Sequence, residues 1–259
     1  MMQEKKIPKK KILKRIVIAG IFILTLLLFG IGLIFSKTLN FNQYLVSGYA
    51  LQGVDVSHYQ GEIDWKRLEN QGIDFAFIKA TEGSSHMDGT FTENWQKAEE
   101  TGLYIGAYHF FSFDSEGRTQ ADWYINTVGE LDGKLAPVVD VEYYADKEVN
   151  PPEKEQVAHE LHEFLQILVE HYRIKPIIYT TYKVYHRYIE DEFKEYPLWI
   201  RNVYYPPNLD MRRKWQFWQY MDRAVLEGYE GAEKYIDLNV FGGTEDELKE
   251  YLVNPGTFD

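Results

Sequence analysis

The sequence predicts an α/β protein: a (β/α) barrel preceded by one N-terminal transmembrane helix. Three observations lead to this prediction. Residues 16–36 form an uncharged apolar run, short β-rich runs alternate with helical patterns after Leu51, and about eight such strands fit into the roughly 210 residues that remain. A domain of this size can bury a large core, and eight strands that alternate with helices are typical of a barrel.

The apolar run at 16–36 predicts a signal-anchor helix. It carries no charge over 21 residues, and as a helix rising about 1.5 Å per residue it spans a bilayer core of roughly 30 Å. A cleaved signal peptide is the alternative, but its apolar region is typically about 7 to 15 residues long and ends in an A-x-A-like site. Residues 1–15 hold seven Lys or Arg against Glu4, which predicts a cytoplasmic basic tail by the positive-inside rule.

Everything after this helix is therefore expected outside the cell. Residues 37–50 are polar and aperiodic, which predicts a short tether, and residues 51–259 are expected to form the extracellular domain. Beyond residue 15 the chain holds 21 basic and 39 acidic residues, a net charge of −18. Such a domain repels polyanions, so nucleic acid is not expected as a substrate or partner.

The composition also limits the chemistry. The chain has no cysteine, which excludes disulfides, thiolate nucleophiles and thiolate metal sites. Its seven histidines are scattered without the HxxxH or HxH spacing of a zinc site. We therefore expect no metal site and no cofactor. Separately, the chain is expected to be a monomer.

The elements of the outer domain alternate along the chain. Strands are expected at 51–57, 74–80, 104–111, 136–142, 176–182, 197–203, 215–220 and 235–241, and helices at 64–72, 92–102, 119–131, 153–172, 183–193 and 245–252. The long helix at 153–172 has Asn150 as its expected cap and Pro151 in its first turn. Because the stretches after Trp199 and Trp218 lack clear helical patterns, the last third is expected to be irregular.

Acidic residues recur at strand ends, where the site of such a barrel lies. They are Asp55, Glu82, Asp140, Glu142 and Asp237. The strand period of two places the two acids of Asp140-Val141-Glu142 on one face. Two carboxyl groups that close cannot both ionise freely, so one pKa should rise into the range of a general acid. The alternative is that these acids cap a helix or pair with a surface lysine.

Several segments resemble glycoside hydrolase family 25, which contains lysozymes acting on peptidoglycan. These segments are GVDVSHYQGEIDW at 53–65, FIKATEG at 77–83, GAYHF at 106–110, PVVDVE at 137–142, PIIYT at 176–180, LWI at 198–200, WQY at 218–220 and IDLNVF at 236–241. They occur in order over nearly all of the outer domain. The resemblance implies an irregular, flattened (β/α) barrel that cleaves the β-1,4 bond between N-acetylmuramic acid and N-acetylglucosamine.

The resemblance also implies four catalytic residues. Glu142 matches the proton donor, and Asp140 matches the acid that orients or stabilises the substrate N-acetyl group during substrate-assisted attack. Asp55 and Asp237 match the other acids of the pocket. This scheme retains the anomeric configuration without a covalent enzyme intermediate, whereas a direct nucleophile and an inverting scheme are the alternatives.

Substrate-binding residues are expected beside these acids. The rings at or near strand ends can stack on sugar faces, although barrel packing is the alternative for each; they are Tyr108, Tyr179, Trp199 and Trp218. Gln60 can bind a substrate acetamide or satisfy a turn, and Glu82 can hold a neighbouring side chain. Lys79 and His109 lie on strands and can pair with these acids inside the barrel, which we expect for Lys79.

Three other functions compete with this hypothesis. A chitinase-like family 18 enzyme also has a D-x-E ending, but two earlier acids of that longer motif are replaced here by Leu135 and Val138. A non-catalytic wall-binding module and an acid-lined phosphodiesterase that needs Mg²⁺ are the others. We expect a peptidoglycan hydrolase anchored in the cell membrane by its N-terminal helix, in a Gram-positive bacterium.

Overall fold

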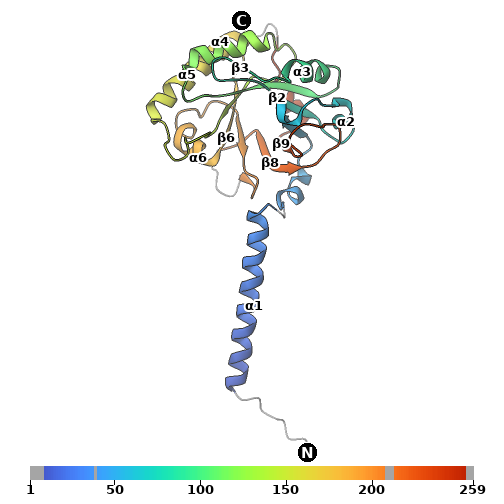
Figure 1. The fold of residues 1–259 in the computed structure, drawn as a ribbon, viewed down its shortest axis with the longest axis vertical. Coiled ribbons are helices and arrows are strands. Elements are labelled where there is room, and N and C mark those ends of the chain that lie inside the picture. The colour runs from blue at the N-terminus through green and yellow to red at the C-terminus, as the bar shows by residue number, and fades with distance from the viewer. Residues whose placement is uncertain (1–8, 38–39, 208–212, 255–259) are drawn as a thin grey trace, which may run out of the picture. The chain divides into compact units, whose positions relative to one another are not determined.

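The computed structural model describes residues 9–37, 40–207 and 213–254. The chain divides into two compact units, Met1–Phe41 and Asn42–Asp259. The first unit contains one continuous helix, α1 (Lys9–Phe35) (Figure 1). Its 27 residues extend about 40 Å at 1.5 Å per residue, which is enough to cross a bilayer. Residues 1–8 of the expected cytoplasmic tail lie outside the described residues.

The expected tether is wrong for residues 42–50, because these residues belong to the second unit. They form two short 3₁₀ helices, η1 (Asn42–Tyr44) and η2 (Val46–Gly48). The side chain of Asn42 is fully buried, and its Nδ2 donates hydrogen bonds to the carbonyl oxygens of Asn202 and Tyr220, at 3.1 and 3.0 Å. The globular domain therefore begins at Asn42, ten residues before the start of its first strand at Gln52, rather than at Leu51.

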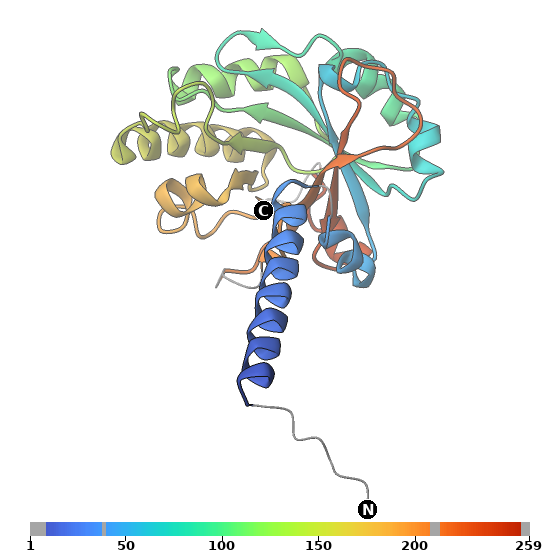
Figure 2. The same ribbon diagram turned by 60° about the horizontal axis from the view of Figure 1, so that its bottom comes forward.

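Eight strands close into a barrel, as predicted (Figure 2). In spatial order they are β1 (Gln52–Val56), β2 (Phe75–Glu82), β4 (Tyr104–Phe110), β5 (Val138–Val141), β6 (Ile177–Thr181), β7 (Leu198–Arg201), β8 (Phe217–Ala224) and β9 (Ile236–Phe241), which returns to β1. Neighbouring strands run parallel except at β9, which is antiparallel to both β8 and β1. Strands that alternate with helices usually run parallel, so β9 departs from the pattern that the sequence predicts. A two-residue strand that was not predicted, β3 (His86–Met87), pairs with the end of β2.

Helices surround this barrel. They are α2 (Trp65–Glu69), α3 (Phe91–Glu99), α4 (Gly117–Val128), α5 (Lys154–Tyr172), α6 (Tyr182–Val184), which continues into a π-helical turn at Tyr185–Ile189, and α7 (Glu245–Lys249). Helices α4 and α5 lie side by side in Figure 1. The expected cap of α5 is wrong: Glu153 occupies the cap position, whereas the Asn150 side chain binds Asp146. The described residues between β7 and β8 and between β8 and β9 form no α-helix, which confirms the irregular last third.

Strand periodicity produces two apolar layers. Side chains that point outward from the strands pack under the helices, while a second cluster fills the inside of the barrel with Phe75, Phe77, Val138 and Phe217 among its members. Glycines make room for these rings. A Cβ on Gly53 would lie 2.2 Å from the ring of Phe75, so a larger residue would displace that ring. The filled interior supports the strand ends, where the chain places its polar residues.

Candidate active site

The inward-facing side chains change from apolar to polar along the strands. Successive inward positions are two residues apart, and the change occurs at Phe77 to Lys79, Val138 to Asp140, Trp199 to Arg201 and Phe217 to Gln219. In β9 the same change runs backwards in sequence, from Phe241 through Asn239 to Asp237, because this strand is antiparallel. One end of the barrel is therefore apolar and filled, and the other carries a polar site.

A cavity of about 470 Å³ opens at this polar end. It is lined by Asp55, Ser57, Tyr59, Lys79, Tyr108, Phe110, Asp140, Glu142, Tyr179, Trp199, Arg201, Gln219, Asp222 and Asp237. The structure thus brings together all four acids that were predicted to be catalytic, and three of the predicted aromatic residues. Three predicted site residues, Gln60, Glu82 and Trp218, are not among those that line it.

Asp55 and Asp237 form one half of the acidic cluster. They lie directly opposite each other on the antiparallel strands β1 and β9, and their carboxyl groups share a hydrogen bond. Burial raises the pKa of both groups. Hydrogen bonds from Asn239 and Gln219 counteract the effect at Asp55, whereas the charge of Asp55 adds to it at Asp237, whose pKa lies well above its usual range. Asp237 is therefore the member of the pair that retains a proton more readily.

Two amides fix the carboxylate of Asp55. Nε2 of Gln219 donates to both of its oxygens, at 2.9 and 3.0 Å, and Nδ2 of Asn239 donates to Oδ1 at 2.6 Å. These amides also hold the cavity's aromatic side chains. The hydroxyl of Tyr179 donates to Gln219 Oε1 at 3.1 Å, and Nε1 of Trp199 donates to Asn239 Oδ1 at 2.8 Å. Asp55 is thus held in a single orientation by β8 and β9.

Asp140 and Glu142 form the other half of the cluster, at the end of β5. Burial, followed by the charge of Glu142, raises the pKa of Asp140 well above its usual range. Burial also raises the pKa of Glu142, against the opposing effect of Arg201. We predicted a raised pKa for one member, and the structure raises both. Oδ1 of Asp140 is buried without a hydrogen-bond partner in the structure, so a ligand that donates a hydrogen bond here would satisfy it.

Two cations belong to the same cavity. Nζ of Lys79 lies 2.7 Å from Glu82 Oε2 and 4.9 Å from the centre of the Phe110 ring. A guanidinium nitrogen of Arg201 lies 2.6 Å from Asp222 Oδ2. Sequence reasoning missed Arg201, although counting two residues on from Trp199 along the strand would have found it. Both cations lower the pKa of Glu142, which keeps that carboxyl group more acidic than burial alone would allow.

Two of the predicted substrate-binding residues have structural roles. Trp218 faces outward from the barrel because its neighbours Phe217 and Gln219 face inward, and it is fully buried with Nε1 donating to the carbonyl of Asn202 at 2.8 Å. The prediction that it stacks on sugar is therefore wrong. Gln60 closes a turn: its Oε1 accepts the backbone N–H of Ser57 and its Nε2 donates to the carbonyl of Tyr235.

Glu82 pairs with Lys79 at the cavity, whereas His109 lies away from it. Glu82 holds Lys79, which is the supporting role allowed for it, and Lys79 lines the cavity as expected. His109 does not form the pairing with an acid that was open to it. This ring is fully buried on the outer side of β4, where Nδ1 lies 2.7 Å from Thr81 Oγ1 and Nε2 lies 3.1 Å from Gln120 Oε1. It bonds no acid, and burial lowers its pKa to about 3.

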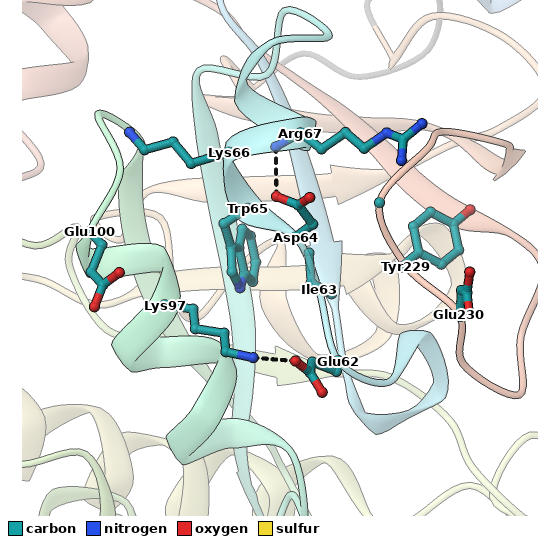
Figure 3. Close-up of a pocket in the computed structure, with 11 residues that line it drawn as sticks. Glu62, Ile63, Asp64, Trp65, Lys66, Arg67, Lys97, Glu100, Tyr229 and Glu230 are labelled. Carbon is teal, nitrogen blue, oxygen red and sulfur yellow. Dashed lines mark hydrogen bonds and ion pairs between the residues drawn. The ribbon is translucent and has the colours of Figure 1, made fainter.

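A larger hollow of about 810 Å³ lies beside α2 (Figure 3). Charged side chains dominate its lining, and several of them form ion pairs: Lys97 pairs with Glu62 and Glu93, and Arg67 pairs with Glu227. None of the predicted site residues lines it. The smaller cavity contains the converging acids with raised pKa values and is therefore the candidate active site. Within residues 9–37, 40–207 and 213–254, no group of three or more His, Cys, Asp or Glu is placed to hold a metal ion.

Comparisons with known proteins agree with this architecture. Residues 54–229 match the family described as "Glycosyl hydrolases family 25". A protein of Escherichia coli O157:H7 named YegX is 36% identical over 220 residues, which cover 82% of this chain and 77% of that protein. "Lysozyme M1" of Streptomyces globisporus is 30% identical over 220 residues, covering 76% and 70% of the two chains.

A solved structure described as a family 25 glycosyl hydrolase from Bacillus anthracis is similar in both fold and sequence. It has a TM-score of 0.75 and 51% sequence identity, and the match covers 79% of this chain and 94% of that one. The family match extends over more than half of the chain and contains six whole strands that line the cavity, β2 and β4 to β8. The chain is therefore a glycoside hydrolase and belongs to family 25.

Proposed function

We propose that this enzyme is a lysozyme-type peptidoglycan hydrolase that cleaves the β-1,4 bond between N-acetylmuramic acid and N-acetylglucosamine. The observation that carries the proposal is the convergence of Asp140 and Glu142 with Asp55 and Asp237 in one cavity. The relative in Streptomyces globisporus is itself named a lysozyme, which supports the choice of substrate. A carboxyl group with a raised pKa can hold a proton at the pH where the enzyme works, as a general acid requires.

Glu142 is the proposed acid. Its proton passes to the glycosidic oxygen as the bond from that oxygen to the anomeric carbon breaks, and the acetamido oxygen of the substrate attacks the same carbon. Water then opens the resulting ring and returns a proton to Glu142. The proposed role of Asp140 is to accept the acetamido N–H, for which its buried and unpartnered Oδ1 is suited. Overall, the anomeric configuration is retained.

The replacement of Glu142 by Gln tests this assignment. Loss of general acid catalysis should lower kcat by about 10²- to 10⁴-fold, while far-UV circular dichroism stays unchanged because the amide has nearly the same shape. Glu148→Gln is the matched control, since Glu148 pairs with Lys183 at the surface and lies outside the cavity. Near-normal turnover by Glu142→Gln would remove Glu142 from the mechanism.

The products test the bond and its stereochemistry. Mass spectrometry of fragments released from purified wall should find muramic acid at the reducing end, and glucosamine there would overturn the proposed bond. NMR of the first-formed product should show the retained anomer, and an inverted anomer would refute substrate assistance. Zymography with and without EDTA separates the other functions, because a phosphodiesterase that needs Mg²⁺ would lose its clearing with the chelator, and a binding module would show none.

The proposed location is the outer face of the cell membrane. Helix α1 is long and apolar enough to cross a bilayer, a property it shares with signal sequences. Its uncharged stretch is longer than the apolar region of typical signal peptides, and seven basic residues in residues 1–15 favour a cytoplasmic N-terminus. An uncleaved anchor would confine hydrolysis to wall close to the membrane of a Gram-positive cell.

A further inference from the structure

Two aromatic rings lie at the rim of the cavity, on the turn that follows β1. This turn is the short helix η3 (His58–Gln60). Tyr59 lines the cavity and yet is 56% exposed, while the side chain of His58 is 41% exposed. The centres of their rings are 4.1 Å apart at an interplanar angle of 36°. The site therefore continues beyond the acidic cluster onto a partly exposed pair of rings.

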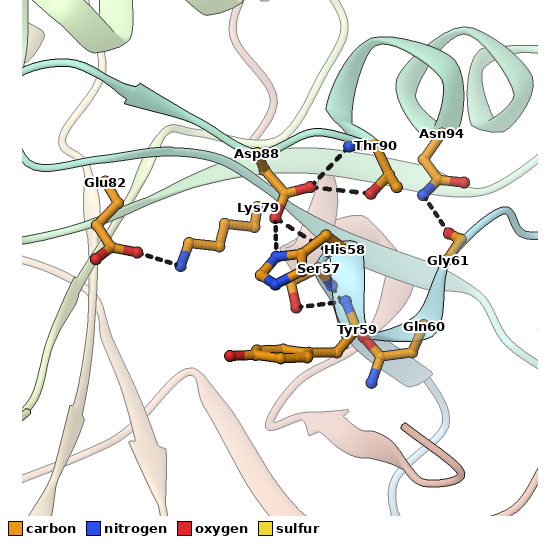
Figure 4. Close-up of polar contacts among 10 residues, drawn as sticks. All are labelled: Ser57, His58, Tyr59, Gln60, Gly61, Lys79, Glu82, Asp88, Thr90 and Asn94. Carbon is orange, nitrogen blue, oxygen red and sulfur yellow. Dashed lines mark hydrogen bonds and ion pairs between the residues drawn. The ribbon is translucent and has the colours of Figure 1, made fainter. Parts of the chain in front are cut away.

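A buried carboxylate holds this pair in place (Figure 4). Asp88 lies between β3 and α3 and is 1% exposed. Its Oδ2 accepts the backbone N–H of His58 at 3.0 Å and contacts Nδ1 of the same residue at 2.9 Å. Its Oδ1 accepts the N–H and the hydroxyl of Thr90, at 3.0 and 2.9 Å. Asp88 thus connects two loops that are 30 residues apart in the chain.

These contacts determine which ring nitrogen of His58 faces a ligand. Although burial raises the pKa of Asp88, hydrogen bonds from His58 and Thr90 lower it below the usual value, so the group is an ionised acceptor. Nδ1 of His58 must then carry the proton that it shares with Asp88. Nε2 is then the ring nitrogen that does not bond Asp88. The backbone beneath is equally fixed, because the carbonyl of Tyr59 accepts the N–H of Glu233 at 2.8 Å.

We propose that His58 and Tyr59 form a platform at the rim of the catalytic cavity, where it binds an N-acetylated sugar of the glycan strand beyond the acidic cluster, and that Asp88 is the residue that positions it. The proposal rests on the proposed function, because a polymeric glycan that enters this cavity must leave it across the rim. The open face of a tyrosine ring suits the C–H face of a pyranose, and Nε2 of His58 offers one hydrogen bond to a hydroxyl or acetamido group.

A platform at the rim predicts an effect that depends on substrate length. In the full chain carrying Glu142→Gln, in detergent, Tyr59→Ala should weaken the binding of long peptidoglycan strands by about 2- to 12-fold, as the loss of a ring contact worth roughly 0.5–1.5 kcal/mol predicts. The affinity for a disaccharide that occupies only the part of the cavity beside the acidic cluster should change less than about twofold. An equal loss for both lengths, or no loss for either, would overturn the platform.

Tyr44→Ala is the matched control. Tyr44 is 64% exposed but is not among the residues that line the cavity, so its loss should leave the affinity for both lengths unchanged. His58→Ala should reproduce the length dependence of Tyr59→Ala. Tyr59→Ala removes a partly exposed ring, and in His58→Ala the backbone N–H at position 58 still donates to the buried Asp88, so a folded protein is expected in each case.

Asp88→Asn tests the positioning role. The variant amide places an NH₂ group against the four N–H and O–H donors of His58 and Thr90. The rings should then lose their fixed orientation, and the affinity for long strands should again fall more than the affinity for disaccharides. ¹⁵N NMR of His58 supplies a second readout, in which Nδ1 is protonated in the parent chain and exchanges between tautomers in the variant. An unchanged tautomer together with unchanged long-strand affinity would exclude Asp88 from this role.

Binding and turnover together separate the two proposals. If the parent enzyme does not cleave peptidoglycan but its strand binding still depends on Tyr59 and on length, the proposed function fails and the platform stands. If the enzyme cleaves peptidoglycan and Tyr59→Ala has no effect of length, the platform fails and the function stands. A chain that neither binds nor cleaves these strands would overturn both.

Discussion

The buried His109 should make the domain sensitive to acid. Its ring lies on the outer side of β4, stacked on Phe164 at a centroid distance of 4.9 Å, and it bonds Thr81 and Gln120. Burial lowers its pKa to about 3, whereas the unfolded chain has a histidine pKa of about 6.5. The folded state therefore resists a proton that the unfolded state accepts, so stability is complete above about pH 6.5 and falls as the pH drops towards 3.

The size of this effect follows from the two pKa values. A pH of 4 lies about 2.5 units below the pKa of the histidine in the unfolded chain, whereas the folded ring is still neutral. At 1.36 kcal/mol per unit, the free energy of unfolding is therefore about 3 kcal/mol lower at pH 4 than at pH 7. That is a large part of the roughly 5–15 kcal/mol that stabilises a typical domain. The burial of one side chain would thus set an acid limit on the fold.

Urea denaturation of the full chain in detergent, at pH 7 and at pH 4, measures this loss. His109→Gln keeps a group that can donate to Gln120 but does not titrate, so the variant should lose about 3 kcal/mol less than the parent between the two pH values. Other titrating groups are common to both proteins, and their contributions cancel in the difference. Equal losses in the parent and the variant would refute the reasoning, because His109 would then titrate alike in both states.

Three further predictions concern the cavity, the barrel wall and the anchor. Asn239→Ala should lower the free energy of unfolding, measured by urea denaturation, by about 1–3 kcal/mol, because Trp199 Nε1 loses its acceptor. The acid limb of its pH–rate profile should move to higher pH, since Asp55 loses a hydrogen bond that lowers its pKa. An unmoved limb would contradict this. Trp218→Phe should cost a similar amount of stability with kcat/KM unchanged, and a selective loss of activity would restore its assignment to the groove. Deletion of residues 1–36 should transfer the protein from membrane to soluble fractions, and continued sedimentation with membranes would argue against the anchor.

The strands were predictable because their apolar runs are local, but their direction was not. The eight runs stand out as short β-rich segments between turns, yet nothing within YIDLNVF shows that β9 runs against its neighbours. That direction is set by pairing with β1 and β8. The two-residue strand β3 was missed because it has no apolar pattern of its own and depends on its pairing with the end of β2.

The acids of the cavity were predictable, whereas the residues that support them were not. Strand period and family resemblance both led to Asp140 and Glu142. Trp218 was misassigned because its aromatic character drew attention, although the strand's inward position is held by Gln219, one residue on. The role of Asn42 left no local signal, since its partners lie 160 and 178 residues away. Contacts at such separations become visible only once the barrel is closed.

The closure between β1 and β9 has a consequence for when activity can first arise. Asp55 on β1 is held by Asn239 on β9, 184 residues later, so this carboxylate acquires its bonding partners only after nearly the whole chain has been synthesised. Pairing at such a separation is slow to form, because a long loop must first be closed. A nascent or truncated chain would therefore be an incomplete hydrolase. For an enzyme that degrades a load-bearing polymer, late assembly of the proposed catalytic centre would be a built-in delay between synthesis of the chain and its attack on that polymer.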